Sequence, residues 1–402
     1  GARVMKIEKI TVHEISDSRG EPTIEAVLSA GGGVFSAQIP SGKSRGKSEA
    51  AVLSTDSAQN ALKEFVAHAV IGKDFENIRA LDSKLITLDG TANKSRIGGN
   101  LALGISVSFA RALAASRGME LWEVLKEEFF PKENASLPFI FSNLINGGAH
   151  ANNNLDIQEY MIIVDTSASV STSFKKLKDF FGKLRKALSR EKGSAEIPFG
   201  DEGGYSLNFS DNFAPIEILQ KLIRSEKLDG EFRIGLDAAA SSFYKGGAYH
   251  FGGQGVSAVE LLNVYAGYFS RASSLYSIED PFAETDHNGF RDLLAKFPDK
   301  LIVGDDITVT NQALIAKLTE GKCINGVIIK PNQIGTLTET CEAMRAAKAR
   351  SVKCIVSHRS GETQDSFIIH IARAGGAYGV KIGAPSKSER LSKFEELLRL
   401  YS

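Results

Sequence analysis

Apolar, strand-like segments end one after another in a charged residue throughout the second half of the chain. The residues at these ends are three acids, two lysines, a histidine and an arginine: Asp237, Glu279, Asp305, Lys330, Lys381, His358 and Arg359. The intervals between the ends fit one strand plus one helix with its loops. A parallel barrel gathers the carboxyl ends of its strands on one face, where catalytic groups lie. We therefore expect these side chains to meet in the pocket of an enzyme.

The three acids indicate a site for a hard divalent cation. Each of Asp237, Glu279 and Asp305 follows an apolar segment, where an ionised carboxylate is costly unless it is paired or bound to a metal. One such acid alone is more often a capping or ion-pairing residue. Three on one barrel face favour Mg²⁺, which prefers oxygen ligands. The sequence has neither His-Glu-x-x-His nor a Cys/His cluster at zinc spacing, so a zinc site is not expected.

The two lysines are candidates for a base. Lys330 ends the apolar run Val327-Ile-Ile, so its side chain should be partly removed from water. Burial and neighbouring cations lower the pKa of a lysine, and we expect this effect to make Lys330 or Lys381 a usable base near neutral pH. The alternative is a structural salt bridge to one of the three acids.

Two further acids lie in loops that glycines open to a ligand. Glu202 belongs to Gly200-Asp-Glu-Gly-Gly204, and Glu159 follows Gln158 after the segment Asn146-Gly-Gly-Ala-His150. Each acid alone is typical of a surface turn. Together they could transfer a proton on the substrate face opposite the lysines.

Two segments bear on phosphate binding. Ser357-His-Arg-Ser-Gly361 places a guanidinium beside hydroxyl groups, which suits a phosphate, although a solvated basic turn is equally compatible. Ser41-Gly-Lys-Ser44 matches only the end of a P-loop, because Ala37 stands where that motif requires glycine. We interpret this segment as a mobile loop in which Ser44 offers a hydroxyl.

The charge of the predicted pocket argues for a metal and an anionic substrate together. The five acids and three of the cationic side chains (Lys330, Lys381 and Arg359) leave a net charge of about −2, which repels an anion. Two divalent cations would reverse that sign and favour a phosphorylated carboxylate. This reasoning does not name the substrate.

The order of the predicted elements divides the chain into two domains. Residues 1–135 predict an α+β domain with three strands followed by helices, over Lys6–Ile15, Thr23–Leu28, Val34–Ile39, Ala58–Ala69, Phe75–Leu85 and Leu101–Arg117. Residues 136–402 repeat strand, loop and helix to the end, which is typical of a barrel of about 250 residues. The fold class is therefore α/β with a smaller α+β domain.

Composition excludes several classes of partner. Lys+Arg and Asp+Glu are equal at 48 each among 402 residues, so no overall field draws nucleic acid or an anionic membrane. No apolar run approaches the roughly 20 residues of a membrane span, and no signal-peptide pattern opens the chain. The three cysteines, Cys323, Cys341 and Cys354, are expected to be reduced. We expect a cytoplasmic protein that acts on a small molecule.

Taken together, the motifs resemble those of the enolase family from about Lys6 to the end of the chain. In order they are Asp17-Ser-Arg-Gly20, Pro40-Ser-Gly-Lys-Ser44, Asn146-Gly-Gly-Ala-His150, Gln158-Glu159, Gly200-Asp-Glu-Gly-Gly204, Ser277-Ile-Glu-Asp-Pro-Phe282, Gly304-Asp-Asp306, Lys330-Pro-Asn-Gln-Ile-Gly335, Ser357-His-Arg-Ser-Gly-Glu-Thr363 and Lys381-Ile-Gly-Ala-Pro385. The resemblance is specific because order, spacing and residue types agree. It implies an α+β cap on an atypical eight-stranded barrel whose early strands break the simple alternation.

The resemblance also implies a reaction, the interconversion of 2-phosphoglycerate and phosphoenolpyruvate with two Mg²⁺ ions in each site. Asp237, Glu279 and Asp305 would hold one ion, and Ser44 would help to hold the second. Lys330 would take the proton from C2, and Glu202, assisted by Glu159, would protonate the leaving hydroxyl. The remaining substrate contacts would come from His150, Gln158, His358, Arg359, Ser360 and Lys381. The family is usually dimeric and sometimes octameric.

The chain departs from the family pattern at a few positions. Lys43 stands where the family usually has alanine, while Ser242 and Gln364 replace usual acids. No proposed catalytic group is lost. Two alternatives stay open: a relative acting on another carboxylate, and a non-catalytic scaffold built on the same frame. Loss of a base or a metal ligand would favour the scaffold.

Overall fold

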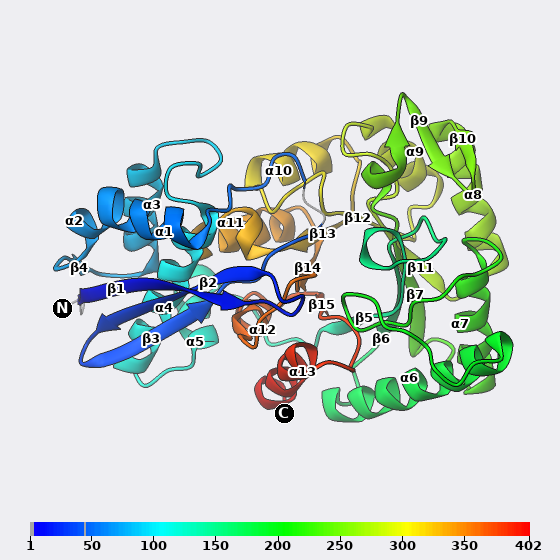
Figure 1. Cartoon of the computed structure of the whole chain (residues 1–402), viewed down its shortest axis with the longest axis horizontal. Helices are drawn as coiled ribbons and strands as arrows, with labels where there is room; N and C mark the ends of the chain where they lie inside the picture. Colours follow the sequence, from blue (N-terminus) through cyan, green and yellow to red (C-terminus); the bar gives the residue numbers. More distant parts are fainter. Residues whose placement is uncertain (1–3, 44–45) are drawn as a thin grey trace.

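The computed structural model describes residues 4–43 and 46–402, which form a cap packed beside a barrel (Figure 1). The cap contains an antiparallel sheet in the order β3-β2-β1-β4, with β1 Met5–Ser16, β2 Pro22–Ala30, β3 Gly33–Gln38 and β4 Asp74–Phe75. The three predicted strands are confirmed. Gly31 and Gly32 have positive φ values and make the turn between β2 and β3, a conformation that favours glycine.

Helices cover one face of the cap sheet. They are α1 Thr55–Ala61, a π-helical segment η1 Leu62–Val66, α2 Ala67–Val70, α3 Ile78–Asp89, α4 Gly99–Ser116 and α5 Leu121–Phe129. Most of α4 is buried against β2 and β3, and Gly104 brings it close to Ala26, whose Cβ would lie 2.8 Å from a Cβ at position 104. The helix expected over Phe75–Leu85 begins only at Ile78. The reason is local, because Asp74 and Phe75 pair with β1.

The barrel is closed in the order β11-β12-β13-β14-β15-β5-β6-β7. Its strands are β5 Phe139–Asn146, β6 Glu159–Val164, β7 Phe232–Asp237, β11 Leu275–Glu279, β12 Leu301–Gly304, β13 Gly326–Ile329, β14 Lys353–Ser357 and β15 Gly379–Lys381. Strand β6 is antiparallel to both β5 and β7, whereas the other neighbouring pairs are parallel. The predicted α/β barrel with an irregular start is therefore confirmed.

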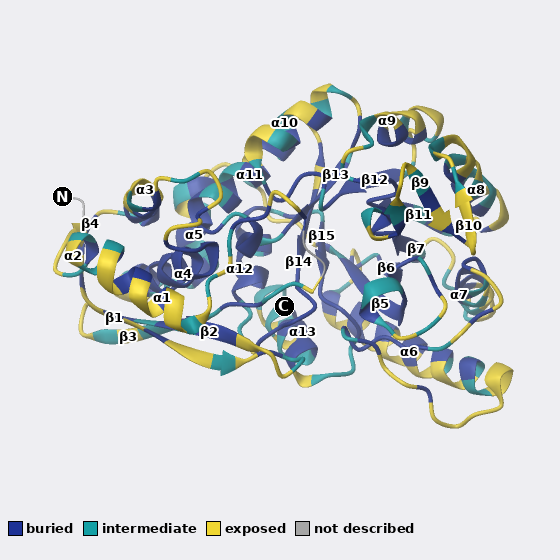
Figure 2. Cartoon of the chain, turned by 45° about the horizontal axis from the view of Figure 1, so that its top comes forward, coloured by how far each residue is buried: buried dark blue, intermediate teal, exposed yellow. Residues whose placement is uncertain are grey.

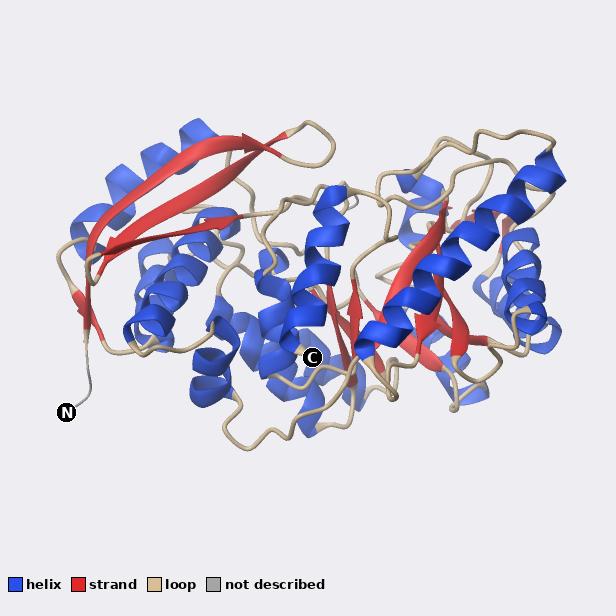
Figure 3. Ribbon diagram, turned by 90° about the horizontal axis from the view of Figure 1, so that it is seen from below, coloured by secondary structure: helices blue, strands red, loops and turns tan. Residues whose placement is uncertain are grey.

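Helices surround the barrel and leave its strands buried (Figures 2 and 3). They are α6 Val170–Lys192, α7 Ala214–Ser225, α8 Ala258–Arg271, α9 His287–Lys296, α10 Gln312–Glu320, α11 Leu337–Ala349, α12 Phe367–Ala374 and α13 Ser388–Leu400. A separate sheet consists of the short strands β8 Tyr244–Lys245, β9 Ala248–Phe251 and β10 Gln254–Val256. Short 3₁₀ turns follow the ends of three barrel strands: η2 Gly148–His150, η3 Ala240–Phe243 and η4 Pro331–Gln333. Within residues 4–43 and 46–402, no helix has both the length and the apolar character needed to span a membrane.

Polar contacts fix the cap against the barrel. Arg111 on α4 forms a bidentate ion pair with Asp365, with Nη2 2.7 Å from Oδ1. At the pocket end, Ser41 and Gly361 exchange backbone hydrogen bonds of 2.8 and 2.9 Å. The cap segment that contains Ser41 is therefore paired directly with the loop after β14, which carries predicted site residues.

Candidate functional site

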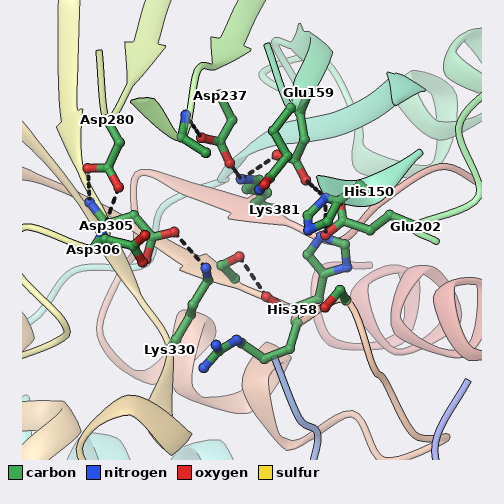
Figure 4. Close-up of a pocket in the computed structure, with 15 residues that line it drawn as sticks. His150, Glu159, Glu202, Asp237, Asp280, Asp305, Asp306, Lys330, His358 and Lys381 are labelled. Atoms are coloured by element: carbon green, nitrogen blue, oxygen red, sulfur yellow. Dashed lines mark hydrogen bonds and ion pairs between the residues drawn. The ribbon is translucent and has the colours of Figure 1, made fainter. Parts of the chain in front are cut away.

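The predicted site residues converge at one end of the barrel (Figure 4). They line a cavity whose walls include His150, Gln158, Glu159, Glu202, Asp237, Asp305, Lys330, His358, Arg359, Ser360 and Lys381. Glu279 is buried beside Lys381, and Ser44 lies outside the described residues. The free space is only about 20 Å³, because the side chains pair across it. That volume holds a water molecule, so a larger ligand requires some of these pairs to open.

Lys381 lies at the centre of three buried carboxylates. Its Nζ is 2.6 Å from Glu159 Oε2, 2.8 Å from Glu279 Oε2 and 3.2 Å from Asp237 Oδ2. Register explains the convergence, since Glu279 pairs with Asp237 and Asp237 pairs with Glu159 across adjacent strands. Burial disfavours the ammonium form, but the surrounding acids outweigh it and raise the pKa of Lys381 well above its usual value. Lys381 is therefore a fixed cation.

Lys330 pairs with the third predicted metal ligand. Its Nζ lies 2.6 Å from Asp305 Oδ2, while Gln333 Nε2 donates to Asp305 Oδ1 at 3.0 Å. We expected burial to lower the pKa of Lys330, and that expectation is wrong for this state of the site. Burial does disfavour the charged form, but the carboxylate of Asp305 outweighs it, and the pKa of Lys330 is raised. Both lysines thus form the salt bridges that we weighed as the alternative.

The acids form closely spaced groups that fit a hard cation. Ligand atoms lie within 4.8 Å of one another in the groups Glu159–Asp237–Glu279 and Asp280–Asp305–Asp306. The predicted ligand set of Asp237, Glu279 and Asp305 is therefore divided between two groups. Lys381 pairs with the first group, and Lys330 pairs with Asp305 of the second. Burial, followed by the neighbouring Asp237, raises the pKa of Glu279 well above its usual value. Crowded buried carboxylates of this kind are stabilised by a divalent cation, and oxygen-only donors suit Mg²⁺.

Glu159 and Glu202 form a coupled pair next to two histidines. His150 Nδ1 lies 3.4 Å from both carboxylates, and His358 Nε2 lies 3.5 Å from Glu202 Oε2. Burial, followed by the charge of Glu202, raises the pKa of Glu159 to about 8. Despite burial, His150 keeps the pKa of Glu202 well below its usual value. The pair can therefore hold one proton near neutral pH, on the side of the pocket away from Lys330 (Figure 4).

Arg359, the guanidinium that we expect to bind an anion, is paired with other side chains of the protein in this structure. Its Nη1 lies 3.1 Å from Glu49 Oε1 and donates to Asn332 Oδ1 at 2.8 Å. A Cβ at Gly42 would lie 1.8 Å from Arg359 Nη2, so the backbone of the cap passes directly over the guanidinium. Ser360 Oγ accepts a hydrogen bond of 2.8 Å from the backbone N–H of Lys43. Arg359 and Ser360 thus lie where barrel and cap meet.

The prediction omitted several residues that build the site. Asp280 accepts hydrogen bonds from the backbone N–H groups of Asp305 and Asp306, at 2.9 and 2.8 Å, and so shapes the loop after β12. The sequence offers an indication of this role, because Asp280 directly follows Glu279 in the motif Ser277-Ile-Glu-Asp280. Glu49 had no such signal. It contacts Arg359 from 310 residues away in the sequence, and the apolar residues that follow it give no indication of that contact.

Comparison with known proteins places the chain among related sequences over nearly its full length. Residues 134–402 match the family described as "Enolase, C-terminal TIM barrel domain", and residues 7–125 match "Enolase, N-terminal domain". A protein named "Enolase" from Anaplasma marginale (strain St. Maries) is 39% identical over 412 residues, which covers 99% of this chain and 94% of that protein. One of the same name from Ehrlichia canis (strain Jake) is 40% identical over 408 residues, covering 98% and 95%. A third, from Campylobacter jejuni subsp. jejuni serotype O:23/36, is 38% identical over 410 residues, covering 99% and 97%.

Proposed function

The chain belongs to the enolase family and is a carbon–oxygen lyase, and from this premise we propose that it interconverts 2-phosphoglycerate and phosphoenolpyruvate with Mg²⁺. This reaction is a step of glycolysis and gluconeogenesis. The observation that carries the proposal is the placement of a lysine and a carboxyl pair across one cavity. Lys330 lies on one side, and Glu202 with Glu159 lies on the other. A dehydration needs such a base and acid on either side of the substrate.

The anionic ends of the substrate have complementary partners in the chain. Lys381 would hold the carboxylate, because its neighbours keep it charged. Arg359 and Ser360 would hold the phosphate, the former with a planar fork that suits phosphate oxygens. His150, Gln158 and His358 would close the remaining wall. A substrate in this position has to displace part of the present ion pairing, which is consistent with the small free volume.

Lys330 would remove the proton from C2 of the substrate. Such a proton is barely acidic, since its loss places a second negative charge on the carboxylate group. Asp237, Glu279 and Asp305 would hold one Mg²⁺ and Ser44 would help to hold a second, and these ions would supply positive charge for the additional negative charge, as is general in the superfamily. Asp305 keeps the Lys330 ammonium protonated in the present arrangement, so Lys330 would serve as the base with the oxygens of Asp305 turned from it to a cation.

Glu202 would protonate the hydroxyl that leaves from C3. We infer that Glu159 stores the proton and that Glu202 delivers it, since Glu159 has the raised pKa and Glu202 the lowered one. Asn143 Nδ2 donates to Glu202 Oε2 at 3.0 Å and would fix the orientation of that carboxylate during transfer.

The test is the ultraviolet absorbance of phosphoenolpyruvate formed from 2-phosphoglycerate, with Mg²⁺ and with excess chelator. Product that forms only with Mg²⁺ supports the reaction, the substrate and the metal together. A folded, metal-binding protein that gives no product would contradict the proposal and favour another carboxylate substrate or a scaffold. We further propose a cytoplasmic homo-oligomer, a dimer or an octamer, with residues 1–135 as the cap and 136–402 as the catalytic barrel.

A further inference from the structure

We propose that Arg390 is a positioning residue that holds the phosphate-binding loop and the proton-donor loop in one arrangement. The phosphate-binding loop is residues 357–361 and the proton-donor loop is residues 200–204. This inference rests on the proposed function for the roles of the two loops. It concerns a residue of the last helix, α13, which neither lines the cavity nor belongs to the predicted site.

The side chain of Arg390 is fully buried, yet among the described residues no carboxylate forms an ion pair with it. Its guanidinium instead donates to backbone carbonyls of both loops. Nη1 donates to Arg359 O at 3.1 Å, and Nη2 donates to Ser360 O at 3.1 Å and to Asp201 O at 3.4 Å. A buried charge is tolerated only where fixed dipoles or an opposite charge stabilise it, and here the carbonyl dipoles provide that stabilisation.

The segment before α13 strengthens the same connection. Ala384 N donates to Glu202 O at 3.1 Å, and Ser386 Oγ donates to Gly203 O at 2.9 Å. Gly383 has a φ of +78°, and a Cβ there would lie 3.0 Å from Arg390 Cδ and 3.0 Å from Glu202 O. Glycine at 383 therefore lets the arginine stem pass beside the proton-donor loop. The end of the chain holds that loop along its length.

This arrangement links two groups that must act on one substrate. Arg359 and Ser360 would fix the phosphate, while Glu202 would deliver a proton to C3 of the same molecule. An error of about 1 Å in such a geometry can cost roughly 100-fold in rate. The guanidinium of Arg390 bonds the backbone beside both groups, so its loss should displace the two groups together. Among the described residues, the acids proposed to bind metal at the ends of β7, β11 and β12 make no hydrogen bond to Arg390.

The test compares Arg390→Ala with Arg399→Ala, which removes another arginine of α13 whose side chain pairs with Glu120 and Glu396 rather than with either loop. Amide hydrogen exchange of peptides spanning 198–206 and 355–364 is the first readout and does not depend on activity. The second is kcat/KM for 2-phosphoglycerate, measured with and without tens of millimolar guanidinium. For Arg390→Ala we expect faster exchange in both peptides, a loss of about 100-fold in kcat/KM and partial recovery with guanidinium. Arg399→Ala should change neither peptide nor the response to guanidinium.

Unchanged exchange in both peptides, or a kcat/KM within about threefold of the wild type, would overturn the proposal. So would a folded Arg390→Ala variant that guanidinium does not rescue. If Arg390→Ala does not fold, Arg390→Lys provides the test, since it keeps the buried charge but has one ammonium for carbonyls on two loops. If both loops of the Arg390→Lys variant are protected from hydrogen exchange as in the wild type, the proposal is also overturned. A wild-type protein without turnover would contradict the proposed reaction, while the exchange comparison would still decide the role of Arg390.

Discussion

Asp305 Oδ2 lies 2.6 Å from Lys330 Nζ, so the proposed base is held by a proposed metal ligand. The contact keeps Lys330 protonated, because the carboxylate outweighs the cost of burying the ammonium. A cation that takes the oxygens of Asp305 would remove this stabilisation. If the proposed assignments hold, Lys330 would become available as a base only once a cation occupies the site, which would link metal binding to the start of the proposed reaction.

Lys330→Ala should abolish turnover of 2-phosphoglycerate while leaving the fold intact. Loss of a general base commonly costs about 10²–10⁴-fold. Among the described residues that line the cavity, the other lysine is Lys381, which is held by three acids. The measurement is phosphoenolpyruvate formation beside a circular-dichroism melting curve. Lys348→Ala, which removes a partly exposed ion pair with Glu133, is the control and should retain activity. Near-normal turnover of Lys330→Ala would rule out its assignment as the base.

Asp237→Asn should weaken Mg²⁺ binding, because it removes one anionic oxygen from a buried donor set. Asp237 lies between Lys381 and the backbone N–H of Ala239, so its geometry is fixed before any cation binds. Calorimetric titration with Mg²⁺ measures the change directly. An affinity equal to that of the wild type would show that Asp237 is not a ligand.

The positions of the strand ends could be predicted because the signal is local. Each apolar run that ends in a charged residue, such as Leu301 to Asp305, indicates both where a strand lies and which side chain stands at its end. The pairing of these side chains carries no comparable signal. Lys381 meets Glu159 because β15, β5 and β6 are neighbours in a closed barrel, a relation that only the assembled sheet defines.

Arg390 illustrates why the rest of the site escaped sequence reasoning. A basic residue in a terminal helix with several charges is typical of a solvent-exposed face, and α13 contains five others: Lys393, Arg399, Glu389, Glu395 and Glu396. Burial of Arg390 follows from how α13 packs behind the loops at 201 and 360. The same holds for Glu49, whose partner Arg359 is distant in sequence.

Asp82 should make the stability of the protein depend on pH. It lies between the cap and the barrel, accepts hydrogen bonds from Thr338 N and Oγ1 at 2.9 and 2.7 Å, and has a pKa raised by burial to about 7. The unfolded chain ionises this acid near 3.8, so its contribution is greatest below that pH and is lost as pH rises to about 7.

Asp82→Asn tests this dependence, because asparagine keeps the oxygen acceptor and cannot ionise. The variant should gain stability relative to the wild type as pH rises from about 4 to 7, by up to about 1.4 kcal/mol per pH unit, and the difference should be constant above 7. Urea unfolding at several pH values gives the difference in free energy. A difference that does not vary with pH would mean that Asp82 is ionised in the folded protein.

Lys43 and Asp201 should be energetically coupled, because they form an ion pair between the cap and the proton-donor loop. Lys43 Nζ lies 3.3 Å from Asp201 Oδ2, with side chains 49% and 27% exposed. A double-mutant cycle of Lys43→Ala and Asp201→Asn, built from the KM for substrate, should give a coupling energy of about 0.2–1 kcal/mol. This coupling energy should decrease as added salt screens the pair. The pair of Lys176 and Glu231, 44% and 33% exposed, is a matched control distant from the site. Equal coupling in both cycles, or none in the first, would show that the ion pair of Lys43 and Asp201 does not affect substrate binding.

Gly42→Ala should impair binding of the substrate phosphate. The added Cβ would lie 1.8 Å from Arg359 Nη2 and 2.5 Å from its Cζ, and the guanidinium is already held by Glu49 and Asn332. Either the cap segment or Arg359 must move, so we expect the KM for 2-phosphoglycerate to rise roughly tenfold or more, as for a lost charge-assisted hydrogen bond. Gly182→Ala on α6 is the control, because no atom lies within 4 Å of its added Cβ and the helix should gain about 0.5–1 kcal/mol. A Gly42→Ala enzyme with wild-type KM would show that Arg359 does not hold the phosphate from the position seen here.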